Sequence, residues 1–125
     1  MSYQHAIEAL LWSSVVGPND EPADNYEPSK ELSNRIYEDW ESFQEKAVKL
    51  GFNPELHRKT CINLIEGDYW DHAAHDFILT RNHCGAGFWD GDWFEPYGSL
   101  LTDLAHTFPE LDLYLDDDDG LVSAL

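Results

Sequence analysis

The feature that most constrains the fold is a regular apolar spacing in the first half of the chain. Apolar residues recur at steps of three and four positions at Leu32, Ile36, Trp40, Phe43, Ala47 and Leu50. This spacing places them on one face of an α-helix. Ser29 can cap the start of that helix, and Gly51 stands where a C-terminal glycine belongs. The pattern predicts an amphipathic helix between Ser29 and Gly51.

Shorter helices are predicted on either side of it. Residues 2–14 predict a helix, and residues 17–28, which are rich in Gly, Pro and Asn, predict a loop. Asn53 as a cap and Pro54 at the first helical position predict a third helix that ends near residue 65. Residues 1–66 are therefore expected to be mainly helical.

The second half of the chain predicts strands. Residues 75–89 combine β-branched and aromatic side chains with the turn sequence Asn82-His83-Cys84-Gly85, and they predict a β-hairpin. A helix is predicted over residues 97–107, and a second hairpin over residues 111–124 with its turn at Asp119-Gly120. The order β-β-α-β-β after N-terminal helices predicts an α+β fold, in which a small antiparallel sheet packs against helices.

The length and the charge limit the class of protein. A chain of 125 residues is expected to form one domain, here a helical part (1–66) followed by an acidic part (67–125). It carries 25 acidic and 7 basic residues, a net charge of −18. Residues 61–125 alone carry 14 acids and one base. This charge argues against binding to nucleic acid or anionic membranes and favours a partner protein with a basic surface. The alternative is that the charge serves solubility alone.

The cysteines and the N-terminus indicate the compartment. Two cysteines do not form a disulfide framework, and the first residues lack the basic stretch of a signal peptide. A cytoplasmic protein with reduced thiols is therefore expected. The sequence predicts no cofactor, and a homo-oligomer is compatible with it.

The candidate partner-binding residues lie in the acidic part. Carboxylates and one aromatic ring are expected to face the basic residues of the partner, and these residues are Asp90, Asp92, Trp93, Glu95, Asp112, Asp116, Asp117, Asp118 and Asp119. Aspartates 116–119 do not match a calcium-binding EF-hand loop, because position 12 of that loop would lie beyond Leu125. A concentration of large aromatic rings suggests a second kind of interface, formed by exposed aromatic side chains, and these residues are Trp70, Phe88, Trp89, Trp93 and Phe94.

Histidines provide an alternative candidate site. His72 and His75, together with Asp76 and His83, could hold zinc or iron, because the first two share a helix face at a spacing of three. In the competing interpretation, His75 or Asp76 caps a turn or pairs with Arg81, the only base in the acidic part. Neither a catalytic triad nor a phosphate-binding loop is present as a sequence motif. We therefore predict no catalytic residues.

Two stretches of the chain carry a resemblance. Residues 75–90, HDFILTRNHCGAGFWD, and residues 113–121, LYLDDDDGL, resemble a family of small acidic proteins of tailed bacteriophages and prophages, with the motif HDFWLTRNxxGAGFWD followed by LYxxDDGL. The chain departs from this motif at Ile78, where Trp is usual, and at His83-Cys84, where a Gly-His pair is usual. The resemblance implies a phage context and a location in the bacterial cytoplasm, and it supplies no catalytic residues.

Charge and resemblance together predict a non-enzymatic, phage-encoded interaction protein. In this hypothesis its acidic surface imitates nucleic acid and inhibits a host defence or DNA-processing protein, because a dense row of carboxylates can imitate phosphates. One alternative is an accessory or regulatory phage protein that binds through exposed aromatic side chains. The other is a metal-binding protein that uses the histidine and aspartate residues named above.

Overall fold

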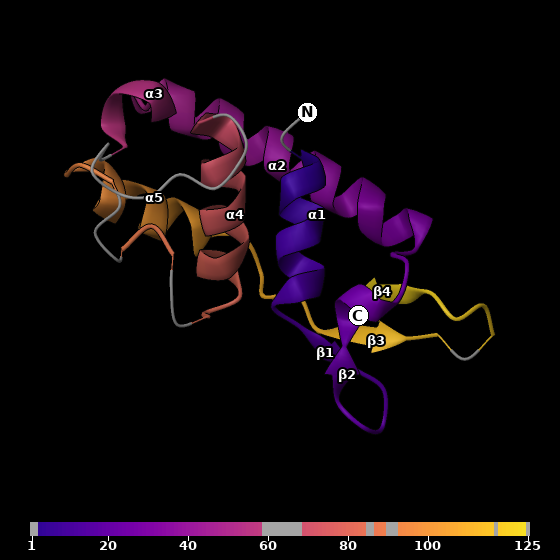
Figure 1. Cartoon of the computed structure of the whole chain (residues 1–125). Coiled ribbons are helices and arrows are strands. Elements are labelled where there is room, and N and C mark those ends of the chain that lie inside the picture. Colours follow the sequence, from indigo (N-terminus) through magenta and orange to yellow (C-terminus); the bar gives the residue numbers. More distant parts are fainter. Residues whose placement is uncertain (1–2, 59–68, 85–86, 90–92, 117, 125) are drawn as a thin grey trace.

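The computed structural model describes residues 3–58, 69–84, 87–89, 93–116 and 118–124. Over these ranges the chain has an α+β fold, with helices and two small antiparallel sheets (Figure 1). The elements are α1 (Tyr3–Trp12), β1 (Val15–Val16), β2 (Glu21–Pro22), the 3-10 helix η1 (Ala23–Asn25), α2 (Lys30–Lys49), α3 (Pro54–His57), α4 (Tyr69–Arg81), α5 (Tyr97–Ala105), β3 (Leu113–Leu115) and β4 (Val122–Ala124).

The long helix predicted from the apolar spacing is confirmed as α2. The backbone N–H of Leu32 donates to the Ser29 hydroxyl over 3.1 Å, which satisfies one of the free amides at the helix start. Gly51 follows the helix with a φ of 93°, a left-handed conformation that glycine adopts without a steric penalty. Five of the six predicted apolar residues are buried, and only Leu50 at the C-terminal end is exposed. This face supplies one wall of the core.

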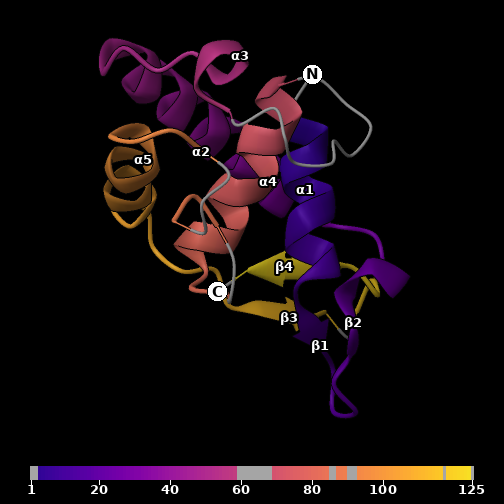
Figure 2. The same ribbon diagram turned by 60° about the vertical axis from the view of Figure 1, so that its left-hand side comes forward.

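The hairpin predicted over residues 75–89 is wrong, because residues 69–81 form α4. This helix runs through the middle of the molecule and contacts α1, α3 and α5 (Figures 1 and 2). Polar residues such as His72, Asp76 and Arg81 are buried on it together with the apolar ones. A helix buried around its whole circumference shows no period of 3.6 residues, so its β-branched and aromatic composition was misleading.

Aromatic side chains fill the space between α2 and α4. The ring centroids of Phe43 and Phe77 lie 4.5 Å apart, and those of Phe43 and Phe88 lie 5.6 Å apart. Phe88 belongs to the segment after α4, where its backbone N–H donates to the Thr80 hydroxyl over 3.0 Å. A Cβ atom on Gly87 would lie 2.2 Å from that hydroxyl oxygen, so only glycine permits this close return of the chain.

Arg81 connects α4 to α2 in the core. Its guanidinium is fully buried, and Nη1 donates to Oδ2 of Asp39 over 2.7 Å. Nε and Nη2 donate to the carbonyl oxygen of Pro109 over 3.1 Å and 2.8 Å. The alternative in which Asp76 pairs with Arg81 is wrong, because the carboxylate partner of Arg81 is Asp39 on α2, 42 residues earlier in the chain.

The C-terminal hairpin is confirmed. β3 and β4 pair antiparallel with Leu115 opposite Val122, and Gly120 in the connection has a φ of 69°. The β1–β2 hairpin, which lies in and just before the predicted loop, was not predicted. The third helix is shorter than predicted, because α3 ends at His57 and Arg58 is extended. Residues 59–65 of that prediction lie outside the described residues. None of the described helices is long and apolar enough to cross a membrane.

Candidate functional site

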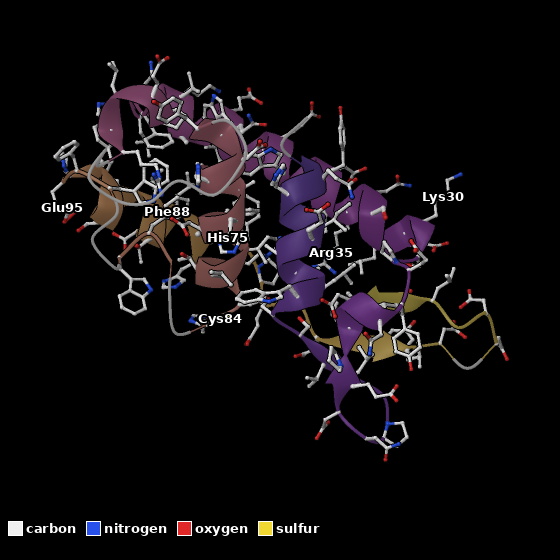
Figure 3. The ribbon with its side chains drawn as sticks, in the orientation of Figure 1. Lys30, Arg35, His75, Cys84, Phe88 and Glu95 are labelled. Carbon is white, nitrogen blue, oxygen red and sulfur yellow. The ribbon has the colours of Figure 1, made fainter. Side chains whose placement is uncertain are left out.

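The predicted partner-binding residues do not gather on one surface. Asp90, Asp92 and Asp117 lie outside the described residues. Glu95 lies next to α5 at one end of the molecule (Figure 3), whereas the β3–β4 connection projects at the opposite end (Figure 1). Asp116, Asp118 and Asp119 belong to that connection, whereas Asp112 precedes β3 and lines a separate hollow with Asn82 and Cys84. The described acidic members of the predicted set are therefore spread over separate regions that a small basic patch could not contact together.

Several of these carboxylates accept hydrogen bonds from backbone N–H groups close to them in sequence. Glu95 caps the start of α5, because its two carboxylate oxygens accept from the Ser99 backbone N–H over 2.8 Å and from the Ser99 hydroxyl over 2.6 Å. Asp116 accepts from the N–H of Asp118 over 2.8 Å, and Asp119 accepts from the N–H of Leu121 over 2.9 Å. Side-chain acceptors of this kind are typical of helix starts and tight turns.

The sequence suggested that Trp93 is an exposed interface residue, but the structure shows it buried. Its side chain is 2% exposed, and the indole Nε1 donates to Oδ2 of Asp76 over 2.6 Å. The ring packs against Phe52 with centroids 5.4 Å apart, and the backbone forms an antiparallel bridge with Arg58. The acidic neighbours suggested exposure, but a large ring with a satisfied N–H group gains more by burial. In the same segment Trp89 is 55% exposed.

The histidine and aspartate residues proposed as metal ligands are only partly brought together. His75 lies beside Asp76, with Nδ1 3.7 Å from Oδ1, and His72 is buried on the same helix. His83 instead stacks on His106, with ring centroids 4.7 Å apart. No group of three or more His, Cys, Asp or Glu side chains in the described part of the chain is arranged to hold a metal ion.

His72 is buried close to charged groups of both signs. Burial lowers its pKa below the ordinary value of 6.5, and the nearby charge of Arg58 adds to this effect, while Asp76 and Asp71 oppose it. The Nε2 atom of His72 and the Nε and Nη1 atoms of Arg58 are buried and have no hydrogen-bond partner within the described ranges. Buried polar groups without partners are uncommon in native structures.

A groove with a different composition lies between α1, η1 and the start of α2. We call it the acidic groove, and it encloses about 490 Å³. Its lining combines carboxylates, aromatic rings and apolar side chains: Gln4, Ile7, Glu8, Leu11, Trp12, Asp24, Tyr26, Glu27, Pro28 and Ser33.

The floor and the rim of the acidic groove differ in polarity. Ile7 and Leu11 of α1 are buried, at 5% and 8% exposure, and they form an apolar floor. Trp12 is 65% exposed at the end of the same helix. Its ring contacts His75 of α4, with centroids 6.0 Å apart. An exposed indole beside a buried apolar surface is typical of a contact site.

Charge in the acidic groove has one sign. Glu8, Asp24 and Glu27 are exposed, and the described residues of the lining include no Lys, Arg or His. Lys30, which follows the groove in sequence, extends outward from the start of α2 (Figure 3). The hydroxyl of Tyr26 donates to the carboxylate of Glu21. This hydrogen bond, followed by desolvation and by the Glu21 charge, raises the pKa of Tyr26, so the phenol stays neutral and adds no charge of its own.

The sequence did not predict this groove. Its two walls are more than ten residues apart in the chain, and one of them lies in the segment predicted as a loop. The available signal was the spacing of Glu8 and Trp12, which are four residues apart and therefore neighbours on one helix face. Asp24 and Glu27, on the other wall, fall within residues 17–28, which the sequence predicts only as a loop.

Comparisons with known proteins give no relative for this chain. No protein-family model matches the sequence, no curated protein is similar to it, and no solved structure matches its fold. The resemblance to the phage family therefore stays a prediction.

Proposed function

We propose that the protein is a non-enzymatic interaction protein, and that its acidic groove binds a basic surface of a partner protein. The observation that supports this proposal is the composition of the groove. Three carboxylates and an exposed indole share one concave surface, and none of the described residues that line it is positively charged.

The whole chain contributes to this recognition. A net charge of −18 creates a negative field that attracts a cationic partner from a distance and accelerates the encounter. The groove then supplies the specific contact, since aromatic residues in concave sites account for much of the binding energy of protein interfaces. A role in solubility alone does not account for the exposed indole of Trp12 in the same groove as these carboxylates.

The class of partner follows from the sequence resemblance. We propose that the protein acts in a phage-infected bacterial cytoplasm, and that the basic surface belongs to a host defence or DNA-processing protein. Such proteins carry basic sites for phosphates, and an acidic protein that occupies such a site acts as a nucleic-acid mimic. Inhibition by occupancy requires no catalytic residue.

A second candidate function is binding through aromatic side chains alone. Trp89 is 55% exposed and Phe94 is 47% exposed, both in the segment between α4 and α5. A phage accessory or regulatory protein could use this surface to bind an apolar partner. Such a complex would resist salt, whereas a complex through the acidic groove weakens as salt increases.

The experiment is a capture of bacterial proteins on the tagged chain, with elution in salt steps and identification by mass spectrometry. We expect a basic DNA-binding protein to elute at moderate salt. The variant Glu8→Lys/Glu27→Lys should lose this protein. The control Glu38→Lys/Asp103→Lys makes the same change of charge at exposed positions on α2 and α5 and should retain it. Equal losses in both variants would contradict a role for the groove, and elution only at high salt would favour the aromatic surface.

A further inference from the structure

We propose that the acidic groove receives the side chain of one arginine of the partner protein. This inference rests on the proposed function and makes it more specific: the groove selects an organic cation with an apolar stem, and it does not respond merely to positive charge.

The apolar floor is the first observation that supports this choice. Ile7, Leu11 and Pro28 line the groove together with the carboxylates. A metal ion or a hydrated ammonium gains nothing from such a surface, whereas the three methylene groups of an arginine stem can pack on it. The volume of about 490 Å³ is ample for one such side chain.

The rim is the second observation. Trp12 and Glu8 come from the same face of α1, and Asp24 and Glu27 come from the segment on the other side of the groove. A planar guanidinium can stack on an indole and donate hydrogen bonds to carboxylates at the same time. Lysine can make the charge contact but cannot stack or donate in a fork, so arginine matches this combination better.

Among the residues that the structure describes, no Lys or Arg side chain lines the groove. Arg35 of α2 points its Nε toward Asp39 at 3.9 Å, and Arg81 is buried on Asp39 and Pro109. A divalent metal ion is a poor alternative occupant, because no group of three or more potential ligands is arranged to hold one in the ranges that the structure describes. An external arginine side chain is the occupant that both charge and shape favour.

Titration of the intact protein with small probes tests this inference by nuclear magnetic resonance. The probes are the Nα-acetyl amides of arginine, lysine and citrulline, and calcium chloride, all at equal ionic strength. We expect saturable shifts from the arginine probe at the backbone amides of residues 7–12 and 24–27. The lysine probe should bind several-fold more weakly, and citrulline, the neutral isostere of arginine, should not bind.

Variants then separate stacking from charge. Trp12→Leu should weaken binding of the arginine probe about fivefold, within the range of cation–π contacts. Trp12→Phe should retain part of the affinity, and Asp103→Asn on α5 should change nothing. The amide spectrum of each variant reports whether it is folded, and Trp12→Phe, the milder change, keeps the test valid if Trp12→Leu is not.

Three results would overturn the inference. They are equal shifts with arginine and lysine, shifts with calcium at the same residues, or an arginine affinity that Trp12→Leu leaves unchanged. If the probe fails but capture of a basic protein still depends on Glu8 and Glu27, arginine recognition is wrong and the proposed function stands. If capture does not depend on these two residues, the proposed function itself is wrong.

Discussion

Two buried arginines lie in two regions of the core and differ in how many of their guanidinium nitrogens have a hydrogen-bond acceptor. Arg81, at the end of α4, donates from three nitrogens to Asp39 and to the Pro109 carbonyl. Arg58, just after α3, is 5% exposed, and its Nε and Nη1 atoms have no partner among the residues described. In the first region each guanidinium nitrogen has an acceptor, whereas in the second two of the three have none among the described residues. Burial of a charged side chain therefore does not by itself indicate that it stabilises the fold.

The surroundings of the two guanidinium groups explain the difference. Arg81 lies 5.4 Å from the rings of Phe77 and Phe108, and the Asp39 carboxylate provides a counter-charge. Arg58 lies 6.0 Å from the ring of Trp93, whose own N–H group already holds Asp76.

The largest expected effect is on Arg81. Arg81→Met removes the guanidinium and leaves the Asp39 carboxylate and the Pro109 carbonyl without donors, so we expect the free energy of unfolding to fall by about 3 kcal/mol. Urea unfolding followed by circular dichroism measures this change. Arg35→Met is the matched control, because Arg35 is partly exposed and its Nε lies 3.9 Å from the same carboxylate, a longer contact than the 2.7 Å of Arg81. This variant should lower the free energy of unfolding by less than about 1 kcal/mol. Equal costs for both variants would contradict the network.

A smaller loss is expected at the hydrogen bond that joins the second region to α4. Trp93→Phe keeps an aromatic ring but removes the N–H donor from a buried Asp76, at a cost of about 2 kcal/mol. Trp89→Phe changes an exposed indole and should stay within about 0.5 kcal/mol. Thermal unfolding of the two variants side by side provides the measurement. A neutral Trp93→Phe would show that water replaces the indole donor.

How much of this could be predicted depends on the pattern that each segment displays. The helix from Ser29 to Gly51 is half exposed, so its apolar residues repeat with the helical period and both ends carry capping residues. The helix that contains Arg81 is buried on all sides, its period is hidden, and it was mistaken for a hairpin. Its partner Asp39 lies 42 residues earlier, and no local signal relates the two positions.

The candidate site follows the same rule. The acidity of the chain was evident, but the predicted residues were those with the densest charge in sequence, at positions 116–119. Asp116, Asp118 and Asp119 belong to a projecting turn, and the side chains of Asp116 and Asp119 accept hydrogen bonds from its backbone. The acidic groove forms from two segments that are each unremarkable alone, so only the packing of η1 against α1 brings Trp12 close to Asp24.

The pH dependence of stability probes the second region more finely. The pKa of His72 in the folded state lies below 6.5, mainly because of burial. In the unfolded chain the histidine regains its ordinary pKa, so as the pH falls through 6.5 the unfolded state takes up the proton first. Stability is therefore full above this pH and decreases below it, until the pH passes the folded-state pKa.

Urea unfolding at pH 8 and at pH 5.5 measures this loss. His72→Gln should reduce the difference between the two pH values, because glutamine has no proton to gain. His106→Gln, a change at an exposed histidine that ends α5, should leave the difference as it is in the parent protein. A difference that survives His72→Gln would place the sensitive group elsewhere.

The smallest change in stability is expected at Arg58 itself, and it tests the comparison most directly. Arg58→Met keeps an apolar stem beside Trp93 and removes nitrogens that gain no hydrogen bonds from the described part of the chain. The free energy of unfolding at pH 8 should therefore change by less than about 1 kcal/mol, or increase. The same variant removes a positive charge that lowers the pKa of His72. Its acid sensitivity should therefore shrink but persist, because burial is the larger cause. A loss at pH 8 as large as that of Arg81→Met would mean that Arg58 is paired as firmly as Arg81, and that the two regions are alike after all.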